Sequence, residues 1–153
     1  MNWLSNKTLN VKVRKNATTK TQNAFQGVYS INKLPTSIPH RPFLAIVNTH
    51  THNLPGEHWL AIYIDENKNG ELFDSLSLPV SNNLIHWLNG FTVKWKTNKR
   101  SFQHPLSAAC GAFVLYFILN RLHVSNFEGI TTLFTSSPFA NEQFVEMFYR
   151  SLK

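Results

Sequence analysis

Cysteine is the rarest residue type in this sequence: among 153 residues there is one, Cys110. A lone cysteine cannot form a disulfide within the chain, whereas small secreted proteins are usually rich in disulfides. Long apolar runs are missing too, because no segment reaches the roughly 18 residues of a membrane span. The basic N-terminal residues also lack the apolar core of a signal peptide. We therefore expect an intracellular protein without a membrane partner.

Acidic residues are few and unevenly placed. The chain carries 15 Lys or Arg against 8 Asp or Glu, a net charge of +7. Residues 1–56 and 75–127 contain no acid at all, and five of the eight acids lie between Glu57 and Asp74. Such asymmetry is typical of proteins that bind a polyanion, so nucleic acid is a candidate partner. Ordinary solvated lysines would explain the same pattern.

One basic cluster is dense enough to name as a nucleic-acid contact. Within seven residues it contains Lys94, Lys96, Lys99 and Arg100. Alternation with apolar residues predicts a half-exposed strand here, with Lys94 and Lys96 on its solvent face. Trp95 or Phe102 could then stack on a base. We predict binding without sequence preference.

The apolar pattern predicts an α+β fold in one domain, residues 1–153. Hydrophobic residues make up 42% of the chain, which is typical of a globular protein. Strands are predicted at 44–48, 59–64, from 71 and at 91–95, and helices at 81–88, 110–123, 125–128 and 137–152. Residues 1–23 are basic and predict a short strand or a loosely ordered arm, since Leu9, Val11 and Val13 alternate with polar residues. The architecture expected is a mixed sheet packed against a central buried helix, 110–123.

Cys110 begins that central helix. Residues 108–119 carry no charge, and Ser107 can cap the helix start. A thiol in the first turn lies near unpaired N–H groups and the positive end of the helix dipole, which both favour thiolate. A buried cysteine that acts only as a small hydrophobic residue is the alternative.

His58 offers the base that a nucleophilic cysteine needs, because it stands just before the apolar strand 59–64. Two alternatives stay open. His50, His52 and His58 could together bind a metal, although zinc sites usually add Cys or carboxylate ligands at tighter spacing, so we expect no metal. Trp59 is either a core residue or a side chain that restricts the His58 ring.

The order of these residues resembles a known family. His58-Trp59, Leu72-Phe73-Asp74, Gln103 and Cys110-Gly111 follow the pattern of the adenain group, the adenovirus-type maturation proteases. These cysteine proteases are related to the Ulp1-type proteases that cleave SUMO. The resemblance runs from about Phe25 to Leu119, and its most specific part is the segment from Gln103 to Gly111.

The resemblance implies a papain-like, adenain-like cysteine protease fold and a set of roles. Cys110 would be the nucleophile, His58 the base and acid, and Asp74 the carboxylate that orients the ring. Gln103 would donate to the oxyanion, and Gly111 would let the substrate backbone approach. The implied activity is cleavage of viral capsid or core precursors next to small residues such as glycine during virion maturation. If the chain is viral, we expect it in the virion and the host nucleus.

Several points stay open at this stage. Glu71 could replace Asp74 as third member, because a simple hairpin over 65–70 places Asp74 opposite Ala61, away from His58. The single cysteine excludes a disulfide-linked peptide cofactor like that of the adenovirus enzyme, while activation by DNA stays an expectation. The competing functions are an isopeptidase that removes a ubiquitin-like protein, and a non-enzymatic nucleic-acid-binding domain. We expect a monomer with no cofactor required for chemistry.

Overall fold

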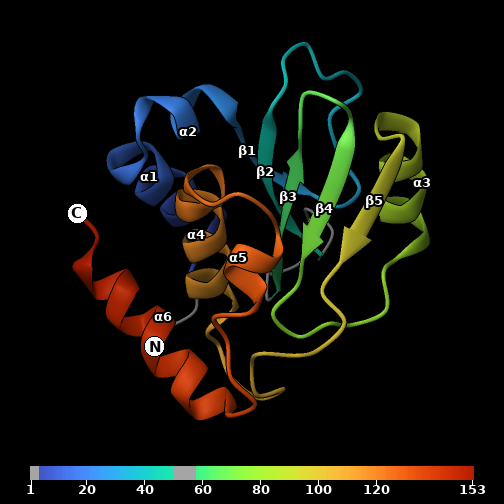
Figure 1. Ribbon diagram of the computed structural model, residues 1–153. Helices are drawn as coiled ribbons and strands as arrows, with labels where there is room; N and C mark the ends of the chain where they lie inside the picture. The colour runs from blue at the N-terminus through green and yellow to red at the C-terminus, as the bar shows by residue number, and fades with distance from the viewer. Residues whose placement is uncertain (1–3, 50–57) are drawn as a thin grey trace.

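The computed structural model describes residues 4–49 and 58–153 (Figure 1). Its elements, in chain order, are α1 (Asn6–Asn16), α2 (Thr19–Ala24), β1 (Phe25–Ser30), β2 (Phe43–Asn48), β3 (Trp59–Ile64), β4 (Asn69–Phe73), α3 (Asn82–Phe91), β5 (Lys94–Thr97), α4 (Cys110–Asn120), the 3₁₀ turn η1 (Arg121–His123), α5 (Glu128–Thr131) and α6 (Pro138–Ser151).

The five strands form one mixed sheet in the order β1-β2-β3-β4-β5. The central pairs β2–β3 and β3–β4 are antiparallel, and the outer pairs β1–β2 and β4–β5 are parallel. Every residue of β2 and β3 is buried, which explains why these strands are continuous apolar runs and not alternating ones. The predicted α+β fold with a mixed sheet is confirmed.

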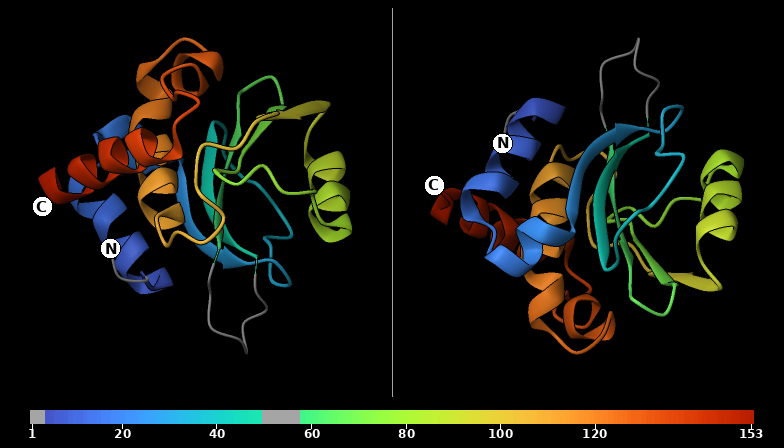
Figure 2. Two further views of the ribbon diagram at one scale, coloured as in Figure 1. Left: turned by 90° about the horizontal axis from the view of Figure 1, so that it is seen from below. Right: turned by 90° about the horizontal axis from the view of Figure 1, so that it is seen from above.

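Helices cover both faces of the sheet unequally. Figure 2 shows α3 alone on one face, and α4 with α1, α2, α5 and α6 on the other. Successive β3 side chains alternate between these layers: Ala61 belongs to the core cluster of α4, and Leu60 to that of α3. The sheet therefore separates two apolar cores.

Helix α4 is the central helix that the sequence predicts. Its residues from Cys110 to Leu115 are all buried, and it packs against α1, α6, β2 and β3. Because layers enclose it on every side, it tolerates apolar residues on all its faces. Within 4–49 and 58–153, no helix combines the length and apolar character needed to cross a membrane.

The N-terminal prediction is wrong. Residues predicted as a strand or a loose arm form α1, which Ser5 caps by accepting a hydrogen bond from the Thr8 N–H. Leu9 and Val13 are both completely buried, whereas Val11 is 38% exposed. Leu9 and Val13 are four residues apart and so share one helix face, a spacing that a short alternating run also contains.

Candidate active site

The end of β4 and the start of β3 bring His58 and Asp74 together. His58 directly precedes β3, Asp74 directly follows β4, and the two strands are antiparallel neighbours. The His58 Nε2 atom lies 2.7 Å from Asp74 Oδ1, and both side chains are buried. A carboxylate in this position orients the ring and stabilises its protonated form.

The Asp74 carboxylate is fixed by its own chain. Oδ1 also accepts the N–H of Leu76 at 2.9 Å, and Oδ2 accepts that of Leu78 at 3.0 Å. The Asn98 side chain holds the Asp74 backbone, since its Nδ2 donates to the carbonyl at 2.7 Å and its Oδ1 accepts the N–H at 2.9 Å. Asp74 therefore needs no rearrangement to hold His58.

Cys110 is the first residue of α4 and is 1% exposed. Burial lowers the pKa of His58, but the hydrogen bond with Asp74 and the proximity of the Asp74 and Cys110 side chains raise that pKa to about 9. Since Asp74 occupies Nε2, the remaining ring nitrogen is Nδ1, which is buried and has no hydrogen-bond partner among the described residues. The prediction that Ser107 caps α4 is wrong: the N-cap residue is Ala109, and the Ser107 hydroxyl accepts the Ala109 N–H at 3.0 Å before the helix begins.

The Gln103 side chain is buried beside the same helix start. Its Nε2 donates to the Ser107 carbonyl at 2.9 Å, and its Oε1 accepts from the Ser75 hydroxyl at 2.5 Å. A carbonyl can only accept, so the amide nitrogen must face Ser107 and the oxygen must face Ser75. The second hydrogen on Nε2 makes no hydrogen bond within the described part of the chain, and the oxyanion role of Gln103 stays a prediction.

Ser75 and Asn98 are site residues that the sequence did not predict. Ser75 follows Asp74 directly and is completely buried. Its carbonyl also accepts the N–H groups of Phe102 and Gln103, at 2.8 and 3.1 Å. The only available signal for Asn98 is its place just after β5, as Asp74 stands just after the parallel strand β4.

We expect Ser75→Ala to lower kcat by about 10-fold. Loss of the hydroxyl frees the Gln103 amide to rotate, which weakens one oxyanion donor; complete removal of such a donor costs about 10²–10³-fold. Affinity for a peptide aldehyde, which forms a tetrahedral adduct, should fall in parallel. The rate of alkylation by iodoacetamide, which makes no oxyanion, should stay the same.

A double variant separates orientation from general damage. In a Gln103→Ala background, Ser75→Ala should add no further loss of kcat, because no amide is left to orient. Ser77→Ala is the matched control, since it removes a nearby hydroxyl that donates to the Asn98 carbonyl. Equal losses from Ser75→Ala in both backgrounds would contradict a positioning role.

The structure places the two supporting residues in the protein interior. Trp59 is fully buried, and its indole N–H donates to Asn6 Oδ1 at 2.8 Å, as a core residue linking β3 to α1. A Cβ added to Gly111 would lie 2.7 Å from Leu4 Cδ1. The missing side chain thus makes room for Leu4, and the role of Gly111 toward a substrate stays a prediction.

The structure resolves one of the two open alternatives, the choice between Glu71 and Asp74. Glu71 is bound to Arg121, with Nε–Oε1 and Nη2–Oε2 distances of 2.7 and 2.8 Å, so it is not the partner of His58. The metal alternative depends on His50 and His52, which lie outside the described residues.

The predicted basic cluster contains fewer available cations than expected. Lys96 bonds Glu128 at 2.8 Å. Arg100 donates to three carbonyls of the α5–α6 connection, those of Thr131, Phe134 and Thr135. Lys94 and Lys99 are exposed. Two of the four predicted cations thus already have protein partners, and nucleic-acid binding by this cluster stays a prediction.

The fold is similar to that of several solved proteins. A protease of ASFV matches with a TM-score of 0.66 at 19% identity, over 94% of this chain and 66% of that one. The SUMO protease Ulp1, with its catalytic cysteine oxidised to a sulfinic acid, matches with a TM-score of 0.52 at 13% identity, over 94% of this chain and 75% of that one. The central domain of Lpg1148 from Legionella pneumophila matches with a TM-score of 0.54 at 11% identity, over 98% and 95% of the two chains.

The comparisons by sequence give a different result, because no family model and no curated protein matches this chain. The chain spans just under two thirds of the ASFV protease. At these low sequence identities, the similarity to the solved structures shows the fold alone. The protein therefore has the Ulp1-like cysteine protease fold.

Proposed function

We propose that this protein is a cysteine peptidase in which Cys110, His58 and Asp74 form the catalytic triad. The observation that carries the proposal is the buried His58 ring, which bonds Asp74 at 2.7 Å and whose pKa the Asp74 and Cys110 side chains together raise. Buried titratable groups with strongly shifted pKa values are typical of active sites.

The chemistry follows from this arrangement. The Cys110 sulfur attacks the peptide carbonyl carbon, and the Gln103 amide stabilises the resulting oxyanion. The C–N bond then breaks, and the imidazolium of His58 gives its proton to the leaving amine. His58 next takes a proton from water, which attacks the thioester. The S–C bond breaks, the carboxylate product leaves, and the thiolate–imidazolium pair is restored.

The substrate that we propose is a viral capsid or core precursor, cut next to a small residue such as glycine. Two findings support it: the sequence pattern from Gln103 to Gly111 resembles the adenain group, and the ASFV protease has a similar fold. Removal of a ubiquitin-like protein is the alternative, supported by the similarity to Ulp1. Both reactions would use the same triad.

A peptidyl vinyl sulfone ending in Gly-Gly tests the peptidase proposal. Its reactive carbon adds to a nucleophilic thiol, so mass spectrometry should locate one adduct, on Cys110. His58→Ala should slow labelling strongly, because the thiol loses its base. A protein that stays unlabelled at millimolar probe would contradict the proposal. Comparing a Gly-Gly peptide with a SUMO fusion then separates precursor cleavage from deconjugation.

Nucleic-acid binding is a second proposal, favoured by the exposure of Lys94 and Lys99 on and beside the edge strand β5. Two phosphate contacts on duplex DNA predict a slope of log K against log salt near about −1.8, at roughly −0.9 per contact. Replacing both lysines by alanine should remove most of this slope, and Lys33→Ala serves as an exposed control. DNA affinity that ignores salt would contradict the proposal.

A further inference from the structure

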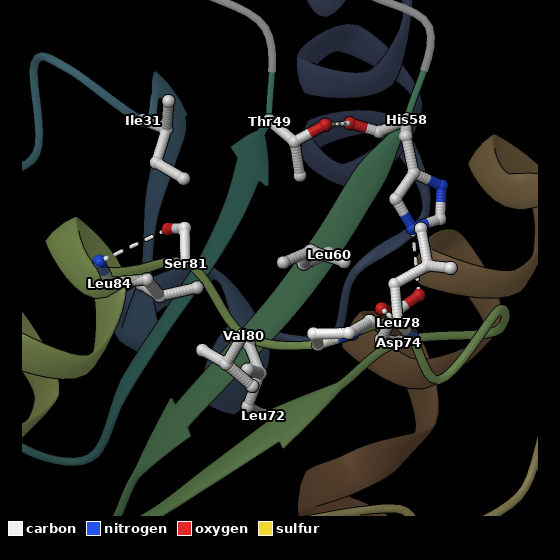
Figure 3. A pocket seen from close by; sticks show the side chains of 11 residues that line it. Ile31, Thr49, His58, Leu60, Leu72, Asp74, Leu78, Val80, Ser81 and Leu84 are labelled. Carbon is white, nitrogen blue, oxygen red and sulfur yellow. Dashed lines mark hydrogen bonds and ion pairs between the residues drawn. The ribbon is translucent and has the colours of Figure 1, made fainter.

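An apolar cavity lies beside the His58–Asp74 pair, on the side away from Cys110. Its volume is about 270 Å³ (Figure 3). His58 and Asp74 form one wall. The other walls are mainly aliphatic side chains, those of Ile31, Leu60, Leu72, Leu78, Val80 and Leu84.

The cavity lies on the face of the sheet opposite α4. Leu60, Leu72 and Leu84 belong to the α3-side core, whereas Cys110 belongs to the α4-side core. The His58 ring therefore stands between the cavity and the thiol. In Figure 3 the ring forms the border of the cavity, with Leu78 and Asp74 below it.

The polar groups on the walls are already engaged. The Thr49 hydroxyl donates to the His58 carbonyl at 3.3 Å, and the Ser81 hydroxyl accepts the Leu84 N–H at 3.3 Å. The Asp74 carboxylate accepts three N–H groups. A polar guest would lose its bonds to water without full replacement, so the cavity selects an apolar guest.

The reaction decides which part of a substrate lies here. After attack, the acyl part stays on the Cys110 sulfur, and the amine that leaves takes a proton from His58. The residue that carries this amine, the first after the scissile bond, must therefore contact His58 on the side away from the acyl part. Its side chain has the bordering cavity within reach.

We propose that this cavity is the specificity pocket for the residue that follows the scissile bond, and that it selects an aliphatic side chain. The proposal depends on the peptidase function proposed above. The volume lies just below the about 300–1,000 Å³ of pockets for drug-sized ligands, which suits a single large side chain.

Two internally quenched peptides that differ only after the Gly-Gly cut test this selectivity. One has leucine there and the other has asparagine, which is nearly the same shape. We expect kcat/KM for the leucine peptide to be higher by at least about 10-fold, the range that apolar pockets give for small apolar differences. Equal values for the two peptides would overturn the proposal.

Leu78→Gln tests the cavity wall itself. Leu78 is 52% exposed, so the variant should fold, and the leucine-to-asparagine ratio should fall at least about 3-fold as one wall becomes polar. Leu133→Gln is the matched control, because Leu133 is also 52% exposed and does not line the cavity. The control should keep the wild-type ratio. A fall of the same size in both variants would overturn the assignment.

Labelling by the vinyl sulfone distinguishes the two possible failures. That probe has no residue beyond the Gly-Gly end, so it reports the thiol chemistry alone. Normal labelling with equal cleavage of the two peptides overturns the pocket and leaves the peptidase proposal standing. A protein that the probe does not label overturns both.

Discussion

Replacing Cys110 by alanine is expected to abolish peptide hydrolysis, with a loss on the order of 10⁶-fold in kcat. Removing the nucleophile of a triad enzyme leaves only the catalysis that the oxyanion site and substrate binding supply. The fold should survive, because Cys110 is a small side chain at the first position of α4. Its truncation should lower the free energy of unfolding by much less than a large core truncation does, which is about 2–5 kcal/mol. Steady-state rates and thermal unfolding of the same preparation measure both quantities.

Cys110→Ser is the matched control for this result. Serine keeps the shape of the side chain but is a far weaker nucleophile beside a histidine, so this variant should also lose hydrolysis at an unchanged melting temperature. Hydrolysis at the wild-type rate by either variant would contradict the proposed peptidase function. A rate that falls together with the melting temperature would point to a structural cysteine instead.

Asp74→Asn is expected to lower kcat by about 10³–10⁴-fold, because the equivalent change in a serine triad leaves the ring in the wrong tautomer. The variant also removes the negative charge that supports the protonated ring. Wild-type activity should fall as pH rises through about 9, where His58 loses the proton that the leaving amine needs.

In Asp74→Asn this alkaline limb should move down toward the ordinary histidine value of about 6.5, because the carboxylate no longer raises the pKa. Measuring kcat/KM between pH 5 and 10.5 locates the alkaline limb in both proteins. Glu66→Gln is the control, since Glu66 is an exposed acid in the β3–β4 turn. An alkaline limb at the same pH in Asp74→Asn and wild type would rule out Asp74 as the charge that supports His58.

The sequence predicted the elements whose apolar residues are either continuous or regularly spaced, the latter being α3 and α6. Strands β2 and β3 and helix α4 are uninterrupted apolar runs, and their burial requires such runs. Helix α1 was missed because Leu9, Val11 and Val13 fit a strand as well as a helix over so short a segment. The hairpin register was off by one residue: Phe73, not Asp74, pairs with Ala61. Lys68, in the turn between β3 and β4, adopts a φ of 64°. A lysine does not predict a positive φ, so the geometry of this turn could not be derived from the sequence.

The candidate site divides in the same way. His58, Asp74, Gln103 and Cys110 could be predicted as candidates because reactive residue types stand in a recognisable order along the chain. Ser75 and Asn98 carry no such signal, since serine and asparagine are common in loops and their importance lies in contacts between distant segments. Burial of a polar side chain is visible only once the fold is known.

Asp74 and Ser75 are consecutive residues, yet one holds the general base and the other the amide of Gln103. Both halves of the proposed site therefore depend on one short peptide segment, and they must assemble or come apart together. That segment also contains its own spectroscopic reporters. The amide protons of Leu76 and Leu78 are bound by the same carboxylate that orients the base. Their exchange with solvent deuterium would thus count the fraction of molecules in which the site is open, in the absence of any substrate.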